Sequence, residues 1–417
     1  MPRAITADLN AHGEMLLAAA TPAPADAAAL RAPIELSVHD DLAAVERDWR
    51  ALTQNGDCTA FQTFEWLDAW QRHVGARTDV HPAIVVGRTG DGSLQFILPL
   101  ATRPMPFGRE LVFLGSELCD YNGPLLAADF TNAVPAAEFG ALWRRIEAAI
   151  RAHPRLQYDI VRLEKMPSVI GGQANPLIAL GVSLNPSGAY ATPLAATWEA
   201  FYAAKRSSAT RSRDRGKRKK LAEHGAVAFV EPQGKDEVLA TLDVLVEQKS
   251  RSFARMGVSN IFARAGNLDF YRALFTDPKA RHLTHLSRLD CGDRPVAVNL
   301  GLTFRDTYYH LQASHDDGEA SRFGPGAAHL HDLLRNAIER GFATYDFTIG
   351  DEPYKRDWCD GVMPLYDHLS AATARGVVLC APTAARARLK RLIKQNPALW
   401  DAFRHIRSFA GRLVPRR

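Results

Sequence analysis

The feature that most constrains the fold is an order of predicted elements that occurs twice along the chain. Each copy begins with a hairpin, continues with a strand and a helix, and ends with a strand that closes the unit. The first copy consists of a hairpin at 83–87 and 94–100, a strand at 111–114, a helix from Pro135 to about Ala152, and a strand at 158–163. Before it, a strand at 34–38 is followed by Asp40, which we expect to cap a helix through Leu42, Val45, Trp49 and Leu52.

The second copy repeats this order in the other half of the chain. It consists of a hairpin at 283–289 and 295–304, a strand at 307–313, a helix at 325–340 closed by Gly341, and a strand at 343–349. The repetition predicts a duplicated α/β domain. The alternative is that a mixed α/β chain shows the same order twice by chance.

The chain of 417 residues is long enough for two or three domains of ordinary size. Gly, Pro, Asn and Ser cluster between Gly181 and Pro193, so we place the boundary there. The predicted division is an N-terminal domain at 33–185 and a C-terminal catalytic domain at 190–375. A basic helical tail at 381–417 follows.

Residues 1–32 are rich in Ala and contain Pro22 and Pro24, which predicts a disordered arm. The apolar stretch in this segment is short, and Asp8 and Glu14 precede it where a signal peptide would carry basic residues. This pattern favours a cytoplasmic protein, with a peripheral position at the inner membrane as the alternative.

The cysteines argue against a disulfide framework and against a structural metal site. There are five, an odd number, and they are widely spaced without a CxxC pair: Cys58, Cys119, Cys291, Cys359 and Cys380. A reducing compartment and a site without metal are therefore expected.

The net charge of +5 is concentrated in two places. Residues 381–417 contain ten Lys and Arg and one acid, Asp401, in a pattern typical of an amphipathic basic helix. Residues 205–220 contain nine Lys and Arg in sixteen positions. The tail suggests contact with an anionic membrane or a partner protein, or packing on the catalytic domain. The second run suggests contact with the phosphates of CoA, a nucleotide-linked sugar or tRNA, or a solvated helix.

The segment 321–327 places two glycines directly before a helix. Gly324 and Gly326 remove side chains where a ligand would approach the backbone, and Pro325 fits the first helical turn. The N–H groups of Gly326, Ala327 and Ala328 would then face outward at a positive helix end, suited to a pyrophosphate. Arg322 would add a charge-assisted contact. A plain turn is the alternative.

This arrangement of strand, glycine-rich loop, helix and strand resembles the GNAT acyltransferase superfamily. Within it, the chain resembles the CelD/BcsL-like acetyltransferases associated with bacterial cellulose and exopolysaccharide synthesis. The segments that carry this likeness are 294–301, 308–312, Gly324-Pro-Gly326, 345–350 with Tyr354-Lys355 and Trp358, and, in the first half, 61–63 and 120–124. The resemblance implies a mixed α+β fold of two tandem GNAT-like domains, each a mostly antiparallel sheet flanked by helices. The implied co-substrate is acetyl-CoA or another acyl-CoA.

The layout is also similar to the Fem-type aminoacyl transferases, which are double GNAT folds that use aminoacyl-tRNA. Gly350, Tyr354 and Lys355 match the spacing of a Fem stretch in which a lysine binds substrate and stabilises developing charge. The resemblance therefore implies such a role for Lys355, with a solvated surface lysine as the alternative.

Acyl transfer requires a base for the nucleophile and donors for the oxyanion. Asp346 alternates with Tyr345 and Phe347 and is a candidate base, or else a carboxylate that binds backbone N–H groups as Asp159 would in the first copy. His310 precedes the loop and ordinarily titrates near neutral pH. A histidine with its hydrogen bonds satisfied inside the sheet is the alternative.

The first domain has no glycine-rich loop before its helix, so it is not expected to bind the cofactor. Asp120 and Tyr121 are candidates for an acceptor pocket between the domains, although solvated loop residues are the alternative. Gln312 and Tyr354 are further candidates for substrate binding, taken from the segments that carry the resemblance.

The sequence thus predicts an N- or O-acyltransferase that moves an acyl group, acetyl by preference, from acyl-CoA to an amine or hydroxyl of a small-molecule or saccharide acceptor. Aminoacyl transfer from tRNA is the alternative reaction. An inactive scaffold that binds a polysaccharide synthase through residues 381–417 is the alternative outside catalysis.

Overall fold

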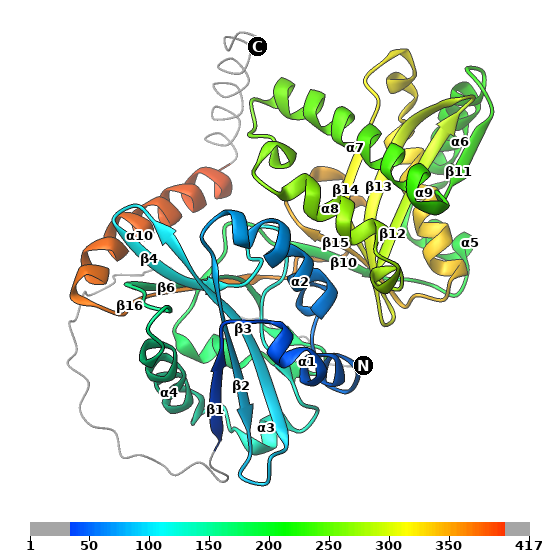
Figure 1. Cartoon of the computed structure of the whole chain (residues 1–417). Helices are drawn as coiled ribbons and strands as arrows, with labels where there is room; N and C mark the ends of the chain where they lie inside the picture. The colour runs from blue at the N-terminus through cyan, green and yellow to red at the C-terminus, as the bar shows by residue number, and fades with distance from the viewer. Residues whose placement is uncertain (1–33, 397–417) are drawn as a thin grey trace.

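The computed structural model describes residues 34–396 and divides them into two lobes, each built on one large sheet (Figure 1). The expected arm at 1–32 and most of the expected tail at 381–417 lie outside the described residues. Within the described range, none of the helices combines the length and the apolar character needed to cross a lipid bilayer.

The first lobe contains a sheet in the order β1-β2-β3-β4-β6-β16-β9, with β5 paired to β3. Its strands are β1 (Glu35–His39), β2 (His81–Arg88), β3 (Leu94–Met105), β4 (Gly108–Phe113), β5 (Leu125–Leu126), β6 (Ile160–Pro167), β9 (Ser183–Leu184) and β16 (Leu365–Ala371). Its helices are α1 (Glu46–Asn55), α2 (Phe64–His73), α3 (Phe130–Ala133), α4 (Phe139–Ala152) and α10 (Ala374–Gln395). A small hairpin, β7 (Val169–Ile170) and β8 (Gln173–Ala174), follows β6.

The second lobe contains a sheet in the order β10-β15-β14-β13-β12-β11. Its strands are β10 (Ala189–Pro193), β11 (Val227–Val230), β12 (Thr284–Cys291), β13 (Arg294–Phe304), β14 (Thr307–His315) and β15 (Thr344–Ile349). Its helices are α5 (Trp198–Lys205), α6 (Ser208–Ala222), α7 (Gly234–Met256), α8 (Asn267–Thr276) and α9 (Pro325–Glu339).

The two sheets repeat one another strand by strand. The order β1-β2-β3-β4-β6-β16 corresponds to β11-β12-β13-β14-β15-β10. In both sheets the first three pairings are antiparallel, and the next, β4 with β6 or β14 with β15, is parallel. The repeated order of elements in the sequence therefore corresponds to a repeated order of strands in space.

The last strand of each sheet is exchanged between the lobes. Along the chain, β10 comes after the first copy, but it pairs with β15 of the second sheet. The strand that follows β15 is β16, and it pairs with β6 of the first sheet. The predicted catalytic domain at 190–375 is therefore corrected at its end, because residues 365–371 complete the first sheet. The hydrophobic periodicity of β10 and β16 could not reveal this exchange, because each strand would bury the same apolar face in either sheet.

The expected elements agree with the structure apart from one cap. The helix start predicted at Asp40 is a 3-10 turn at Ala43–Val45, followed by α1, and the carboxylate that accepts the N–H of Ala43 belongs to Asp41. The largest apolar cluster spans both lobes and includes Trp66 of α2 and Phe270 of α8, whose rings meet edge to face. This shared core gives the two lobes a common interior.

Candidate active site

Strands β14 and β15 separate after a short paired stretch. They pair in parallel only from Thr307 with Thr344 to Tyr309 with Asp346. Beyond this point, β14 carries a bulge at Leu311 in its register with β13, and β15 carries a bulge opposite Tyr190 and Ala191 of β10. Bulges re-aim strands, so the two strands diverge and leave a gap in the sheet.

A cavity of about 410 Å³ opens at this gap. Its lining combines the free end of β14, the start of α9 and aromatic residues after β15. These residues include His310, Ser314, Gly326, Leu330, Tyr354 and Trp358. The cavity therefore joins the divergent strands to the entrance of α9.

The entrance of α9 has the backbone geometry that its glycines allow. Gly324 has φ 65° and Pro325 occupies the first helical position. A Cβ on Gly326 would lie 3.2 Å from the ring of His315, so a larger side chain there would crowd the cavity. The N–H of Ala328 donates to Gly324 O at 3.0 Å, so it is used within the first helical turn. This corrects the predicted anion site, in which the N–H groups of Gly326 and Ala327 remain as candidates.

Arg322 does not take the place expected for it beside this entrance. Its guanidinium lies over the ring of Phe323 at 4.8 Å, and the side chain is exposed. A second cavity of about 240 Å³ adjoins the first and shares Gly324 and Ala327 with it. The cations that line this second cavity are Arg215, Lys217, Arg218 and Arg335.

Three of these four cations come from α6, the helix formed by the basic run. The carboxylates in the same lining already have partners: Asp332 pairs with Arg218 at 2.8 Å, and Asp214 accepts the hydroxyl of Tyr202 at 2.7 Å. The lining is therefore positive in net charge. The sequence contains this basic run but does not show that it lies beside α9, because the contact between α6 and α9 depends on how α6 folds back over the sheet.

His310 and Asp346 lie on opposite faces of the sheet. His310 Nδ1 is 2.9 Å from the hydroxyl of Tyr345, within the apolar side that packs under α9. Burial, together with the charges of Lys355 and Lys249, lowers the pKa of His310 to about 3. The histidine is therefore neutral at neutral pH, in contrast to the expected titration near pH 7.

Asp346 faces the interface between the lobes. Its Oδ1 accepts the hydroxyl of Tyr121 and the N–H of Thr348, both at 2.7 Å. Burial raises the pKa of Asp346 to about 7, although these hydrogen bonds act in the opposite direction. The structure thus brings together two residues, Tyr121 and Asp346, that the sequence placed in different domains.

Lys355 is buried, so it is not a surface lysine. Its ammonium group donates to Ile349 O at 3.0 Å and Thr348 O at 3.3 Å, and it pairs with Glu352 at 2.9 Å. It therefore holds the end of β15 just beyond the gap. Lys249 of α7 was missed by sequence reasoning; burial lowers its pKa to about 8, with Lys355 acting in the same direction.

The other predicted substrate-binding residues, Asp120, Tyr354 and Gln312, lie in three different surroundings. Burial raises the pKa of Asp120, which lies close enough to Lys165 and Lys355 for both cations to oppose that shift. Tyr354 lines the larger cavity and is 38% exposed. Gln312 is half-buried on β14 and does not line either cavity.

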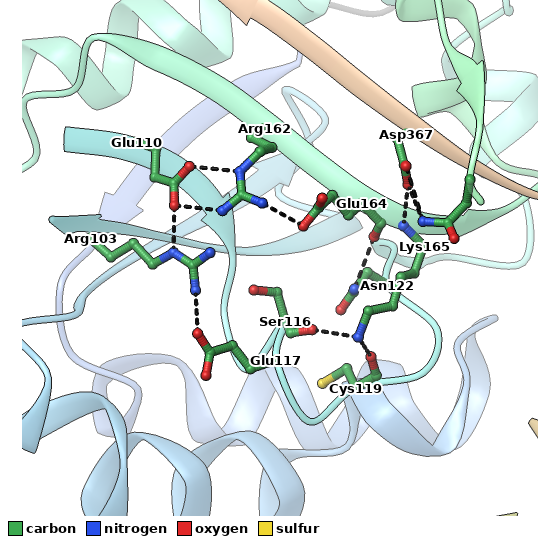
Figure 2. A network of polar contacts seen from close by, with 11 residues as sticks. Arg103, Glu110, Ser116, Glu117, Cys119, Asn122, Arg162, Glu164, Lys165 and Asp367 are labelled. Atoms are coloured by element: carbon green, nitrogen blue, oxygen red, sulfur yellow. Dashed lines mark hydrogen bonds and ion pairs between the residues drawn. The ribbon is translucent and has the colours of Figure 1, made fainter. Parts of the chain in front are cut away.

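The loop that carries Asp120 and Tyr121 is fastened by polar contacts from β6 (Figure 2). Lys165 Nζ donates to Ser116 O at 2.8 Å and Cys119 O at 2.6 Å. Its own N–H donates to Asp367 of the exchanged strand β16 at 2.9 Å. Asn122 donates to Glu164 O at 2.9 Å. The exchange of strands therefore helps to place Tyr121 against Asp346.

Neighbouring ion pairs reinforce the same region. Glu110 of β4 accepts from Arg103 of β3 and from Arg162 of β6, each at 2.7 Å, and Arg103 also reaches Glu117 of the loop (Figure 2). Glu110 is buried, and its two arginines hold the pKa of its carboxyl below the usual value against the effect of burial. This network connects three strands of the first sheet to the loop.

With this geometry in view, the comparisons with known proteins identify the second lobe. Residues 208–356 match the family model described as an acetyltransferase (GNAT) domain. The chain carries a GNAT acyltransferase domain. The match begins at α6 and ends just after Lys355, so it contains the gap, the entrance of α9 and the basic helix.

Solved structures show the same fold across both lobes. FemX aligns with a TM-score of 0.54 at 12% identity, covering 81% of this chain and 97% of that chain. A conserved protein of unknown function from Bacteroides thetaiotaomicron VPI-5482 aligns with a TM-score of 0.50 at 11% identity, covering 81% and 100%. Among curated proteins, none matches the chain in sequence. At this identity the likeness concerns the fold alone.

Proposed function

We propose that the GNAT domain transfers an acetyl group from acetyl-CoA to an amine or hydroxyl of a saccharide in exopolysaccharide or cell-envelope synthesis. The observation that carries this proposal is the divergence of β14 and β15 over the entrance of α9. A thioester chain fits into a gap between strands, and a pyrophosphate fits at a helix entrance that presents backbone N–H groups.

The donor is held in three parts. The pyrophosphate meets the N–H groups of Gly326 and Ala327, with the glycine allowing close approach. The phosphorylated nucleotide end lies over the positive lining from α6, where Arg215 and Lys217 supply charge. The acyl arm enters the gap between β14 and β15, beside Tyr354.

The acceptor approaches from the opposite face, where Asp346 meets the loop of the first lobe. A carboxylate whose pKa is about 7 is matched to accept a proton at neutral pH. The nucleophile gives its proton to Asp346 as it attacks the thioester carbon, and the oxyanion that forms collapses to expel the CoA thiolate. Because the acyl group lies in the gap, residues from both faces of the sheet reach it.

The saccharide class follows from the likeness to the CelD/BcsL-like acetyltransferases. An acceptor at the interface would meet Asp120 and Tyr121, whose carboxylate and hydroxyl are suited to sugar hydroxyl and amine groups. Asp346 and Tyr121 come from different lobes, so this site exists only when the two lobes are assembled.

Donor binding is tested by thermal unfolding of the full chain with CoA, acetyl-CoA and tRNA. A ligand that prefers the native state stabilises it by about 2.7 kcal/mol at a hundred times its Kd. We expect stabilisation by CoA and acetyl-CoA and none by tRNA. Stabilisation by tRNA alone would replace this proposal with aminoacyl transfer.

The placement of the donor is tested by Gly326→Asp, which adds bulk and negative charge at the proposed pyrophosphate site. We expect the CoA-dependent stabilisation to disappear. Gly140→Asp is the matched control, because Gly140 lies in the first turn of α4 with open space around its Cα. Loss of CoA binding in both variants, or in neither, would refute this placement.

Turnover is tested by release of CoA thiol with a panel of amino sugars and oligosaccharides. We expect release with members of this panel and mass-spectrometric detection of the acetylated sugar. A chain that binds CoA but acetylates no saccharide would disprove the acceptor class while leaving the donor site intact.

A further inference from the structure

Exposed large apolar side chains gather around α10. In residues 34–396 there are ten such side chains, and six lie on this helix or beside residues that touch it: Phe107, Leu184, Val377, Val378, Leu389 and Leu392. We call these six residues the α10 patch. Exposed apolar side chains that gather on one part of a surface indicate a contact site.

Four members of the α10 patch share one face of the helix. At 100° per residue, Val377, Val378, Leu389 and Leu392 fall within an arc of about 120°. Their exposed fractions are 64%, 72%, 58% and 62%. The inner face packs on the first lobe through Gly376, which is buried against the backbone of Asp159. The apolar stripe therefore points away from the protein's own core.

Phe107 and Leu184 extend the patch beyond the helix. Leu184 O accepts a hydrogen bond from Arg391 of α10. Next to Phe107, Gly108 is so close to Leu379 of α10 that an added Cβ would lie 3.0 Å from its methyl group. These contacts make the hairpin tip and the helix parts of one surface.

Phe107 itself is held in a costly conformation. Its φ of 67° lies in the left-handed region, which disfavours residues larger than glycine, and its ring is 81% exposed. It stands between Pro106, which is exposed, and Gly108, which is half-buried, at the turn from β3 to β4. A phenyl ring presented to solvent at a hairpin tip is apolar surface of the kind that membrane-surface helices bury at the boundary between head groups and acyl chains.

The charge of α10 shows which partner the patch fits. Residues 374–395 contain six Lys and Arg and no Asp or Glu. Arg375 and Arg386 are exposed and lie just outside this arc, so cations border the apolar stripe on one side, while the exposed Arg388 lies within the arc. An apolar stripe bordered only by positive charge is the pattern of a helix that lies in the plane of an anionic bilayer.

We propose that the α10 patch binds an anionic phospholipid surface, with the helix lying parallel to it and the ring of Phe107 entering the head-group layer. The proposed occupant is the lipid surface itself, and a polysaccharide synthase or another protein is an outcome of the test. This inference is independent of the proposed reaction.

The test is co-sedimentation of the full chain with vesicles of phosphatidylcholine alone or of phosphatidylcholine with phosphatidylglycerol. We expect sedimentation only with the anionic vesicles, weakening as salt is added. Equal binding to both kinds of vesicle, or to neither, would overturn the proposal. If the chain binds neither kind of vesicle, the α10 patch is instead interpreted as a contact site for a protein partner.

Variants separate the apolar and electrostatic parts of binding. Leu389→Ser with Leu392→Ser should weaken partitioning by roughly tenfold through lost apolar burial. Arg386→Gln with Arg388→Gln should weaken it by about fivefold per charge. Lys219→Gln with Lys220→Gln on α6 is the charge-matched control, because those lysines are exposed on a helix with no apolar stripe.

Each variant is first checked by urea unfolding for an unchanged free energy of unfolding, which reports an intact fold. The proposal is rejected if the α6 control loses as much vesicle binding as the α10 variants. It is also rejected if either α10 pair binds as the unmodified chain does. Neither result would alter the assignment of the donor site.

Discussion

The two lobes have the same strand order but differ beyond the parallel strand pair, where a loop lies along β6 in the first lobe and a cavity opens in the second. In the first lobe, β4 and β6 pair at only two positions, Glu110 with Ile160 and Leu111 with Val161. The loop that follows β4 lies across the space beyond, where Lys165 binds its carbonyl groups. In the second lobe, the chain after β14 turns into the glycine-rich entrance of α9 and leaves a cavity.

This contrast shows how a duplicated fold divides its tasks. Each lobe has a lysine that donates to two backbone carbonyls near its gap, Lys165 in the first and Lys355 in the second. The first lysine fastens a loop that delivers Tyr121 to the neighbouring lobe. The second holds the strand end beside the cavity. The first lobe thus supplies part of the site that the second lobe needs.

The largest expected effect comes from substituting Asp346, compared with Asp159, the aspartate that the sequence places at the equivalent position of the first copy. Asp346→Asn removes the proposed base, so we expect the rate of acetyl transfer to fall by about 10²- to 10⁴-fold. Asp159 accepts the N–H of Arg109 at 3.1 Å and the hydroxyl of Thr373 at 2.9 Å, so Asp159→Asn should affect stability instead. Rates measured with the saccharide that shows turnover compare the two. Equal rate losses would remove the distinction between the lobes.

The next effect concerns the loop that fills the first gap. Lys165→Met leaves the carbonyl groups of Ser116 and Cys119 without their donor, so we expect the free energy of unfolding to fall by about 2–3 kcal/mol. Urea unfolding measures this change in stability. The affinity for CoA, measured separately, should change by less than about twofold. A large loss of CoA affinity with unchanged stability would contradict the role given to the first gap.

A smaller effect is a shift in pH dependence. Transfer requires the carboxylate form of Asp346, so the rate should rise as the pH passes through about 7. The hydroxyl of Tyr121 stabilises that carboxylate and lowers its pKa, so Tyr121→Phe should move this rise to higher pH. A hydrogen bond worth about 1 kcal/mol corresponds to a shift of about 0.7 pH unit. A pH profile with the same midpoint would show that the lobes do not cooperate at this contact.

A further effect of similar size compares the two helix entrances. Gly324→Ala forces a side chain into the left-handed region and should lower stability by about 1–2 kcal/mol. Gly140 lies inside the first turn of α4 with open space around it, so Gly140→Ala should raise stability by about 0.4–1 kcal/mol. Thermal unfolding of both variants gives the signs. The same sign in both would mean that the entrance of α9 is not special in its backbone geometry.

The sequence by itself determined the elements, their repetition and the entrance of α9. These properties are local, since hydrophobic periodicity defines strands and helices, and glycines before a helix define a close backbone approach. Asp346 could also be placed on the face opposite Tyr345 and Phe347, because strand side chains alternate.

Only the tertiary structure decided which side chains meet across the lobes. The exchange of β10 and β16, the contact of Tyr121 with Asp346 and the return of α6 to α9 all join residues far apart in sequence. Burial followed from the same packing. It lowered the pKa of His310 to about 3, against the expected titration near neutral pH, and it made Lys355 an internal donor, against the alternative of a solvated surface lysine. A residue's pKa and partners depend on its surroundings, and the order of residues alone does not contain those surroundings.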